Sequence, residues 1–181
     1  MDFQIKKLCI ENISHINIAN QPFQIIGKLK LYFSDGVWHF EEVLSEMVTE
    51  KQYPNYDGAD AEDYISSVDR IAYLACDGDK CVGQILLAKA WNGYAHIEDI
   101  SVAEEYRGQG IGTALLSKAE EWAKEQGLFA LSLECQDNNV LASRFYKKNG
   151  FHIGGVNTDL YRMLGKPYED EIAVFWYKKF R

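Results

Sequence analysis

Apolar and polar residues alternate along much of the first hundred positions, which is the pattern of β-strands with one buried face. The segments that show this alternation are 3–10, 23–33, 37–44, 71–76, 81–90 and 94–102. Ser34-Asp35-Gly36 and Asp77-Gly78-Asp79-Lys80 are tight-turn signals, so each is expected to close a hairpin. Residues 11–19 favour a short helix, and the stretch 50–63, with its proline, glycine and acids, favours a loop.

In the second half of the chain, the spacing of apolar residues changes in two segments from that of strands to that of helices. Apolar residues recur at helical spacing in two segments, 113–127 and 138–150, and each ends on a glycine. Strand-like segments lie between and after them, at 128–135, 151–156 and 171–180. Consecutive strands, a helix, a strand, a helix and closing strands predict an α+β domain with a mixed sheet. At 181 residues, the chain is expected to form a single domain over 1–181.

Composition narrows the function classes. The net charge is −8, from 19 basic and 27 acidic residues, which disfavours nucleic acid and suits a cationic partner. The four cysteines, Cys9, Cys76, Cys81 and Cys135, form no CxxC pair, so we expect reduced thiols and no metal site. Residues 1–19 mix apolar residues with Lys, Glu and Asn, which predicts neither a signal peptide nor a membrane span; we expect a cytoplasmic protein.

The most informative segment is 102–113, VAEEYRGQGIGT, where a strand ends and a helix begins. Three alternating glycines there let several backbone N–H groups converge without obstruction from a Cβ atom. Together with the helix dipole, they predict a site for a pyrophosphate or another anion. A dinucleotide fingerprint needs a glycine at position 113, where threonine stands, and a Walker A loop needs a Gly-Lys-Ser/Thr ending that is absent. A helix that merely follows a flexible turn is the remaining alternative, so the flanking residues must decide.

Two motifs flank this loop in a recognisable order. R-x-x-G-x-G falls at Arg107, Gly110 and Gly112, and N-x-x-A-x-x-x-Y-x-x-x-G-F runs from Asn139 to Phe151. The pair resembles the acetyl-CoA signature of the GNAT superfamily of N-acetyltransferases over at least residues 71–151. The resemblance implies a mixed, mostly antiparallel central sheet with helices on both faces and a splayed parallel strand pair that holds acetyl-CoA. It divides the domain into N-terminal elements on the acceptor side (1–70), a catalytic core (71–151) and closing strands (152–181).

The resemblance also implies residue roles. In such enzymes the loop amides hold the pyrophosphate and the preceding strand pairs with the pantetheine arm. The positions that match a cofactor-binding role are Ile100, Ser101, Val102, Arg107, Gly108, Gln109, Gly110, Ile111, Gly112, Thr113, Asn139 and Tyr146. Tyr146 matches the tyrosine that protonates the departing thiolate, and a backbone N–H near Ile100 could stabilise the oxyanion.

The acceptor amine must lose a proton before it attacks, so a base is needed. Glu98 lies on the strand expected beside the thioester, and similar GNAT aminoglycoside acetyltransferases keep a glutamate there. We therefore expect Glu98 to act as the base, through a water, or to anchor the substrate ammonium. In a regular strand Asp99 points to the opposite face, but a bulge would change which acid faces the cleft. His96 is also within range, Glu134 on a later strand is a weaker candidate, and all of these could be ordinary strand residues.

A finer resemblance, to streptothricin acetyltransferases, rests on short matches along nearly the whole chain. They are Trp91-Asn92, IEDI at 97–100, LSLE at 131–134, GGVNTDLY at 154–161 and E-x-A-x-x-W at 171–176. Such enzymes acetylate an amino group of the β-lysine portion of streptothricin and so confer antibiotic resistance. The residues expected to bind the substrate are Trp91, Asn92, Glu98, Glu134, Asp159 and Tyr161.

Three alternatives stay open from the sequence. The acceptor could be another polyamine, an aminoglycoside or a peptide lysine. The chain could instead be a non-catalytic acetyl-CoA sensor, although a sensor has no need of Glu98 and Tyr146. Trp176, in a strand that reads as buried, could belong to the core rather than to the pocket. In every case we expect a small cationic amine as partner, no nucleic acid or membrane, and a homodimer as one possible state.

Overall fold

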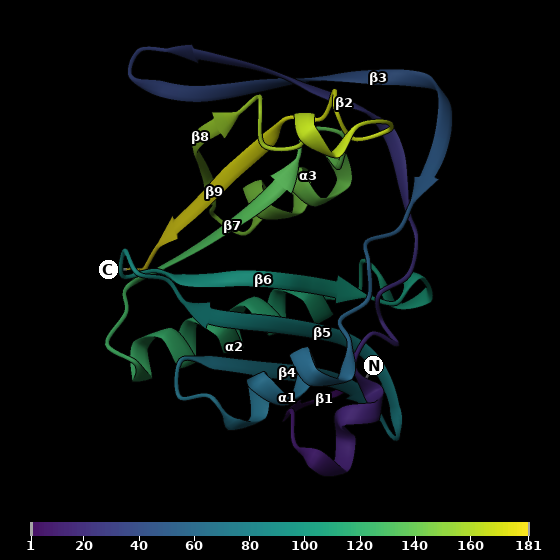
Figure 1. Ribbon diagram of the computed structural model, residues 1–181, viewed down its shortest axis with the longest axis vertical. Coiled ribbons are helices and arrows are strands. Elements are labelled where there is room, and N and C mark those ends of the chain that lie inside the picture. The colour runs from purple at the N-terminus through teal and green to yellow at the C-terminus, as the bar shows by residue number, and fades with distance from the viewer. Residues whose placement is uncertain (1, 181) are drawn as a thin grey trace. The chain divides into compact units, whose positions relative to one another are not determined.

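The computed structural model describes residues 2–180 (Figure 1). Its strands are β1 (Gln4–Lys7), β2 (Phe23–Ser34), β3 (Val37–Lys51), β4 (Arg70–Asp77), β5 (Lys80–Lys89), β6 (Ala95–Val102), β7 (Ala130–Gln136), β8 (His152–Asn157) and β9 (Ala173–Lys179). Its α-helices are α1 (Gly58–Ser66), α2 (Ile111–Glu125) and α3 (Val140–Lys148), and its 3-10 helices are η1 (Ile10–His15), η2 (Glu104–Tyr106) and η3 (Arg162–Leu164). Within residues 2–180, the structure contains no helix with the length and apolar character needed to cross a membrane.

The chain folds into two compact units. The first takes in the described parts of Met1–Phe23, Gln52–Leu131 and Phe180–Arg181, and the second takes in Gln24–Lys51 and Ser132–Lys179. In the first unit, β1, β4, β5 and β6 are neighbours in that order, and each adjacent pair is antiparallel. The start of β7, Ala130 and Leu131, also belongs to the first unit.

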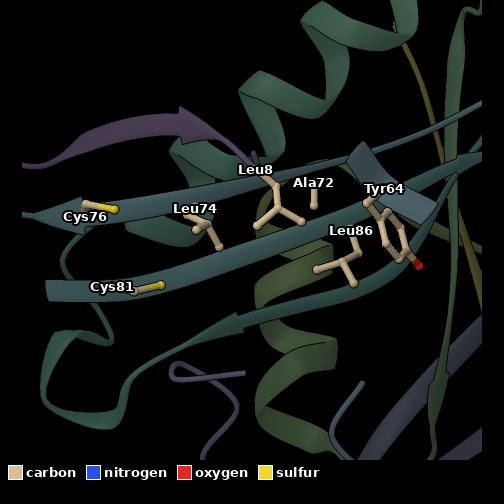
Figure 2. Packing of buried hydrophobic residues seen from close by; sticks show 7 residues of the cluster. All are labelled: Leu8, Tyr64, Ala72, Leu74, Cys76, Cys81 and Leu86. Carbon is tan, nitrogen blue, oxygen red and sulfur yellow. The ribbon is translucent and has the colours of Figure 1, made fainter. Parts of the chain in front are cut away.

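The sheet of the first unit has two covered faces because its strands are apolar at successive positions. Tyr64 of α1 packs with Ala72, Leu74 and Leu86 on one face. Figure 2 shows this cluster, which also includes Leu8, Cys76 and Cys81. The two cysteines are register partners across the β4–β5 hairpin and are free, as the sequence indicates.

Helix α2 covers the other face. Lys118 lies over the ring of Tyr73, and a Cβ added to Gly83 would lie 3.0 Å from Ile111 and 3.2 Å from Leu115. Tyr73 and Gly83 alternate with the residues of the Tyr64 cluster along β4 and β5, so α1 and α2 lie on opposite faces (Figure 1). A glycine at position 83 is what lets α2 approach β5 this closely.

The second unit contains the strands β9 and β8, which are antiparallel neighbours, most of β7, the helix α3 and the long β2–β3 hairpin. Its core is aromatic: Trp176 packs edge-on to Phe40 and lies 5.9 Å from Tyr146, centroid to centroid. Trp176 is only 1% exposed, which supports its assignment to the core.

One sequence expectation is wrong. The stretch 50–63 is not a continuous loop, because β3 extends to Lys51 and α1 begins at Gly58. The helix begins there because the Asp57 side chain accepts a hydrogen bond from the Asp60 amide at 2.8 Å, which satisfies an otherwise unpaired N–H. Asp57 therefore acts as a helix cap and not as a loop residue. The single-domain division of the chain stays a prediction.

Candidate active site

The glycine loop leads from β6 through η2 into α2, all in the first unit. Gly108 and Gly110 have φ angles of 76° and 89°, in the left-handed region that glycine adopts without strain. Gly110 is the N-cap of α2, and it provides no side-chain cap to the first N–H groups of the helix. Those N–H groups have no acceptor within the helix, so they are available to a ligand.

The loop fits an anion. The first turn of α2 carries no acidic residue, so nothing there opposes a negative group at the positive end of the helix dipole. A Cβ added at Gly108 or Gly110 would meet no atom within 4 Å, so the space above the loop is open. Both features suit a diphosphate held by main-chain donors.

Arg107 holds the loop in place. Its Nε donates to the carbonyl of Val102 at 2.9 Å and its Nη2 donates to the carbonyl of Pro22 at 3.0 Å. Its own amide donates to the Glu104 carbonyl inside η2. Gln109 also folds back, and its side chain donates to the carbonyl of Glu105. The amides placed to meet a ligand therefore begin after Arg107.

A β-bulge lies in β6 at the two acids. Asp99 is opposite Leu86 and Ile97 is opposite Leu87, so Glu98 is the additional residue without a partner on β5. The extra residue bends a strand and changes the direction of its side chains. Burial raises the pKa of Tyr56, and the negative charges of Asp99 and Glu98 raise it further.

The Glu98 carboxylate is held from two sides. The Tyr64 hydroxyl donates to Oε2 at 2.5 Å, and Arg70 lies 3.5 Å from Oε1. In Figure 2 the Tyr64 hydroxyl points away from the apolar cluster that surrounds its ring. Burial and the bond to Glu98 raise the pKa of Tyr64, so it remains a donor. The Tyr56 hydroxyl donates to the Glu98 main-chain carbonyl at 3.2 Å.

The Asp99 side chain is half-buried and has hydrogen-bond partners on β5 and β6. Burial raises its pKa, and hydrogen bonds from Gln84 and Ser101 oppose that rise. Gln84 Nε2 donates to Oδ2 at 2.7 Å, while the Ser101 hydroxyl lies at 3.4 Å. Ile100, Ser101 and Val102, which follow on β6, are all half-buried.

The other candidates of the first unit differ in exposure. His96 on β6 is half-buried, and burial lowers its pKa, which favours a neutral imidazole. Trp91 and Asn92 lie in the turn between β5 and β6, and Trp91 is 97% exposed. Their role in substrate binding stays a prediction.

Tyr146 and Asn139 belong to the second unit and are carried by α3. Tyr146 is 7% exposed, and its ring packs against Phe151 and Trp176. The Asn139 side chain accepts a hydrogen bond from the Ala142 amide at 3.1 Å, as the N-cap of α3. This bond gives Asn139 a structural role, and its expected contact with the cofactor stays a prediction.

Glu134 and Tyr161 are brought together in the second unit. Burial raises the pKa of Glu134, and a hydrogen bond from Tyr161 opposes that rise. Tyr161 also accepts a bond from Gln136 Nε2 at 3.0 Å. Glu134 Oε1 is buried and has no hydrogen-bond partner within the described part of the chain. Asp159 is exposed and pairs with Arg162 at 3.0 Å.

Three side chains of the site could not be found from local patterns: Tyr64, Arg70 and Gln84. Glu98 lies on β6, whereas Tyr64 lies in α1 and Arg70 begins β4. Gln84 lies on a further strand, β5. The only sequence signal was the apolar run of β5, in which Gln84 is the one polar residue between Val82 and Ala88. Among the described residues, no group of three or more His, Cys, Asp or Glu side chains is arranged to hold a metal ion.

A loop with free main-chain donors at a helix start, after a strand that carries two acids, suits the binding of a phosphate-bearing cosubstrate beside a cationic group. The sequence profile of the Acetyltransferase (GNAT) family matches residues 37–151. The chain belongs to this family of acetyltransferases.

Relatives and solved structures refine the comparison. The chain is 42% identical to streptothricin acetyltransferase A of Bacillus subtilis (strain 168), over 97% of this chain and 99% of that one. A streptothricin acetyltransferase of Escherichia coli is 39% identical, over 64% of this chain and 68% of that one. A crystal structure of a candidate streptothricin acetyltransferase from Bacillus anthracis str. Ames, in complex with acetyl coenzyme A, has a TM-score of 0.91 at 33% identity and covers 99% of this chain and 100% of that one.

These findings confirm the expected family, the GNAT fold and the acetyltransferase class. A crystal structure of nourseothricin acetyltransferase, 24% identical with a TM-score of 0.82 over 99% of each chain, supports the same fold. The cosubstrate that the sequence predicts, acetyl-CoA, is the molecule bound in the Bacillus anthracis protein.

Proposed function

We propose that this protein transfers the acetyl group of acetyl-CoA directly to a primary amine of streptothricin, on its β-lysine portion, and so confers resistance. The observation that carries the proposal is the bulge in β6 at two neighbouring carboxylates, Glu98 and Asp99. This strand leads into the glycine loop. The 42% identity to a streptothricin acetyltransferase over nearly the whole chain supports the choice of acceptor.

The glycine loop supports the part of the proposal that concerns acetyl-CoA, the acetyl donor. We propose that the amides from Gly108 to Thr113 bind the diphosphate, and that Arg107 keeps the loop against β6 through its bonds to main-chain carbonyls. Acetyl-CoA supplies the acetyl group as a thioester, which an amine can attack without an enzyme-bound intermediate. The main chain of residues 100–102 would direct the pantetheine arm.

Glu98 and Asp99 support the part of the proposal that concerns the acceptor amine. An amine arrives as an ammonium ion and is attracted by carboxylates that are partly shielded from water. Glu98 either removes the proton, through a water molecule, or anchors the ammonium while Asp99 supplies the second negative charge. Arg70 lies 3.5 Å from Glu98 and offsets part of its negative charge. The charge of Asp99 therefore contributes to the attraction of the ammonium ion.

The remaining roles are those that the resemblance to acetyltransferases implies for Tyr146, Glu134 and Tyr161. Tyr146 donates the proton that the sulfur needs when the new C–N bond forms and the C–S bond breaks. Glu134, with the hydroxyl of Tyr161, would bind a second ammonium group of a polycationic acceptor, because its Oε1 lacks a partner. Trp91, Asn92 and Asp159 are proposed to line the acceptor site.

The proposal is tested with purified protein, acetyl-CoA and a panel of amines. We expect free thiol to be released in step with acetylated streptothricin, identified by its mass, and much slower release with an aminoglycoside or a lysine peptide. Turnover of another amine in place of streptothricin would overturn the acceptor and retain the acetyltransferase. Absence of turnover with every amine would overturn the proposal as a whole.

A further inference from the structure

Gln84 on β5 is a wholly buried polar residue that no motif accounts for, with 0% of its surface exposed. Both ends of its amide are used. Nε2 donates to Asp99 Oδ2 at 2.7 Å, and Oε1 accepts from the main-chain N–H of Asn17 at 2.8 Å. Burying an amide is favourable only when both of its polar ends are satisfied, so this placement is specific.

Asn17 continues the network. It follows η1 and has a φ of 70°, a left-handed conformation that asparagine tolerates. Its side chain donates to the Tyr56 carbonyl at 2.8 Å and accepts from the Tyr56 amide at 3.0 Å. These two bonds hold the main chain of Tyr56 in one position.

Tyr56 connects the network to the other acid, Glu98. Its hydroxyl donates to the Glu98 carbonyl, and its ring meets that of Tyr64 edge to face at 6.2 Å. Tyr64 in turn donates to the Glu98 carboxylate. A continuous set of hydrogen bonds and ring contacts therefore joins Asp99 to Glu98 through residues far apart in the sequence.

We propose that Gln84 is a positioning residue of the acceptor site, which orients the Asp99 carboxylate, favours its charged form, and links it through Asn17 to the placement of Tyr56 beside Glu98. The inference rests on the proposed function, in which both acids face the acceptor amine. Gln84 does not touch the reacting atoms and acts through Asp99.

The direction of the effect follows from simple electrostatics. A donated hydrogen bond stabilises a carboxylate, whereas burial and like charges destabilise it. Asp99 and Glu98, on the same strand, both act on Tyr56 from the segment before α1, Arg70 at the start of β4 is paired with Glu98, and the Ser101 hydroxyl is a second donor to Asp99. Removing the Gln84 donor leaves these groups in place, so the pKa of Asp99 must rise.

The test compares Gln84→Met with Gln52→Met. Methionine keeps the length and apolar stem of glutamine and removes its donor and acceptor. Gln52, which is exposed, is the control for the loss of a glutamine donor in the same unit, because its Nε2 donates to the main-chain carbonyl of Asn20 at 2.8 Å and not to either acid. Proteins labelled with ¹³C at aspartate are titrated by NMR, with Asp99→Asn to assign the resonance, and the pH profile of kcat/KM is measured for streptothricin.

We expect Gln84→Met to raise the pH at which Asp99 titrates by about one to two units, the size of one hydrogen bond to a charged group. The acid limb of kcat/KM should move by the same amount, and Gln52→Met should leave both unchanged. If Gln84→Met does not fold, Gln84→Glu retains an acceptor for Asn17, adds a like charge beside Asp99 and should move the titration in the same direction.

An Asp99 titration that is the same in the folded Gln84 variant and in the wild type would overturn the inference. The NMR titration needs no turnover, so it is independent of the proposed function. Wild-type protein that ignores streptothricin, with a shifted Asp99 titration in Gln84→Met, would refute the acceptor while leaving the control of Asp99 by Gln84 intact.

Discussion

Replacing Gly110 with alanine separates the conformational role of the glycine loop from its ligand role. Gly110 has a φ of 89°, where an L-residue loses about 1–2 kcal/mol. An added methyl group meets no atom within 4 Å, so no clash adds to this cost. Alanine also restricts the unfolded chain, which offsets about 0.4–1 kcal/mol. The net loss of unfolding free energy is therefore about 1 kcal/mol, or roughly 2–4 °C in Tm for a chain of this size.

The effect on acetyl-CoA should be larger. We propose that the diphosphate binds at the loop amides, where a methyl group on Gly110 would compete with it for the open space around this residue. Displacing one hydrogen bond to a charged group weakens binding by about 1.5–3 kcal/mol, which is roughly tenfold or more in Kd. Isothermal titration calorimetry with acetyl-CoA and thermal unfolding of the free protein measure the two effects separately.

Gly78→Ala is the matched control. Gly78 lies in the β4–β5 turn with a φ of 60° and has no atom within 4 Å of an added Cβ. It should lose similar stability, yet bind acetyl-CoA as the wild type does. If Gly110→Ala and Gly78→Ala bound acetyl-CoA equally well, the reasoning about the loop would be refuted.

Three further substitutions, the last with a control variant, test other parts of the account. Tyr146→Phe should lower kcat by a factor on the order of 10²–10⁴ and leave the Kd of acetyl-CoA unchanged; an unaltered kcat would remove Tyr146 from the reaction. Glu98→Gln should lower kcat/KM for streptothricin by a similar factor, and retention of activity in steady-state assays would transfer the role to Asp99. Glu171→Gln should destabilise the protein by about 3 kcal/mol in urea titrations, because it removes the negative charge that balances Lys51, 2.7 Å away, in a pair whose side chains are 12% and 7% exposed. The exposed Glu105→Gln, which removes the carboxylate paired with Lys80, should cost much less because water screens that pair, and equal losses would contradict the argument from burial.

Local chemistry made part of the structure predictable. Gly110 at the start of α2 and Gly127 just beyond its end have positive φ angles, as the glycine pattern indicates. The two hairpins follow from their turn residues, and Cys76 and Cys81 face each other across one of them as the spacing suggests. In each case the signal and the structure lie within a few residues of one another.

The rest depends on contacts between distant segments. The bulge at Glu98 is set by pairing with β5, and periodicity within β6 alone could only raise it as an alternative. Tyr64 meets Glu98 because α1 packs on β4, and α1 lies in a stretch whose proline and glycine favour a loop. Lys51 and Glu171, 120 residues apart, pair only once their strands are placed. Long-range packing of this kind leaves no local pattern in a single sequence.

The central claim is that main-chain donors of the glycine loop bind the diphosphate of acetyl-CoA. The most direct measurement follows the backbone amide resonances of residues 108–113 in ¹⁵N-labelled protein as acetyl-CoA is added, with amides of the Asp77–Lys80 turn as an internal reference. We predict saturable downfield shifts at the amides after Arg107 and none in the reference turn. Binding of acetyl-CoA that left the resonances of 108–113 unmoved would contradict the account.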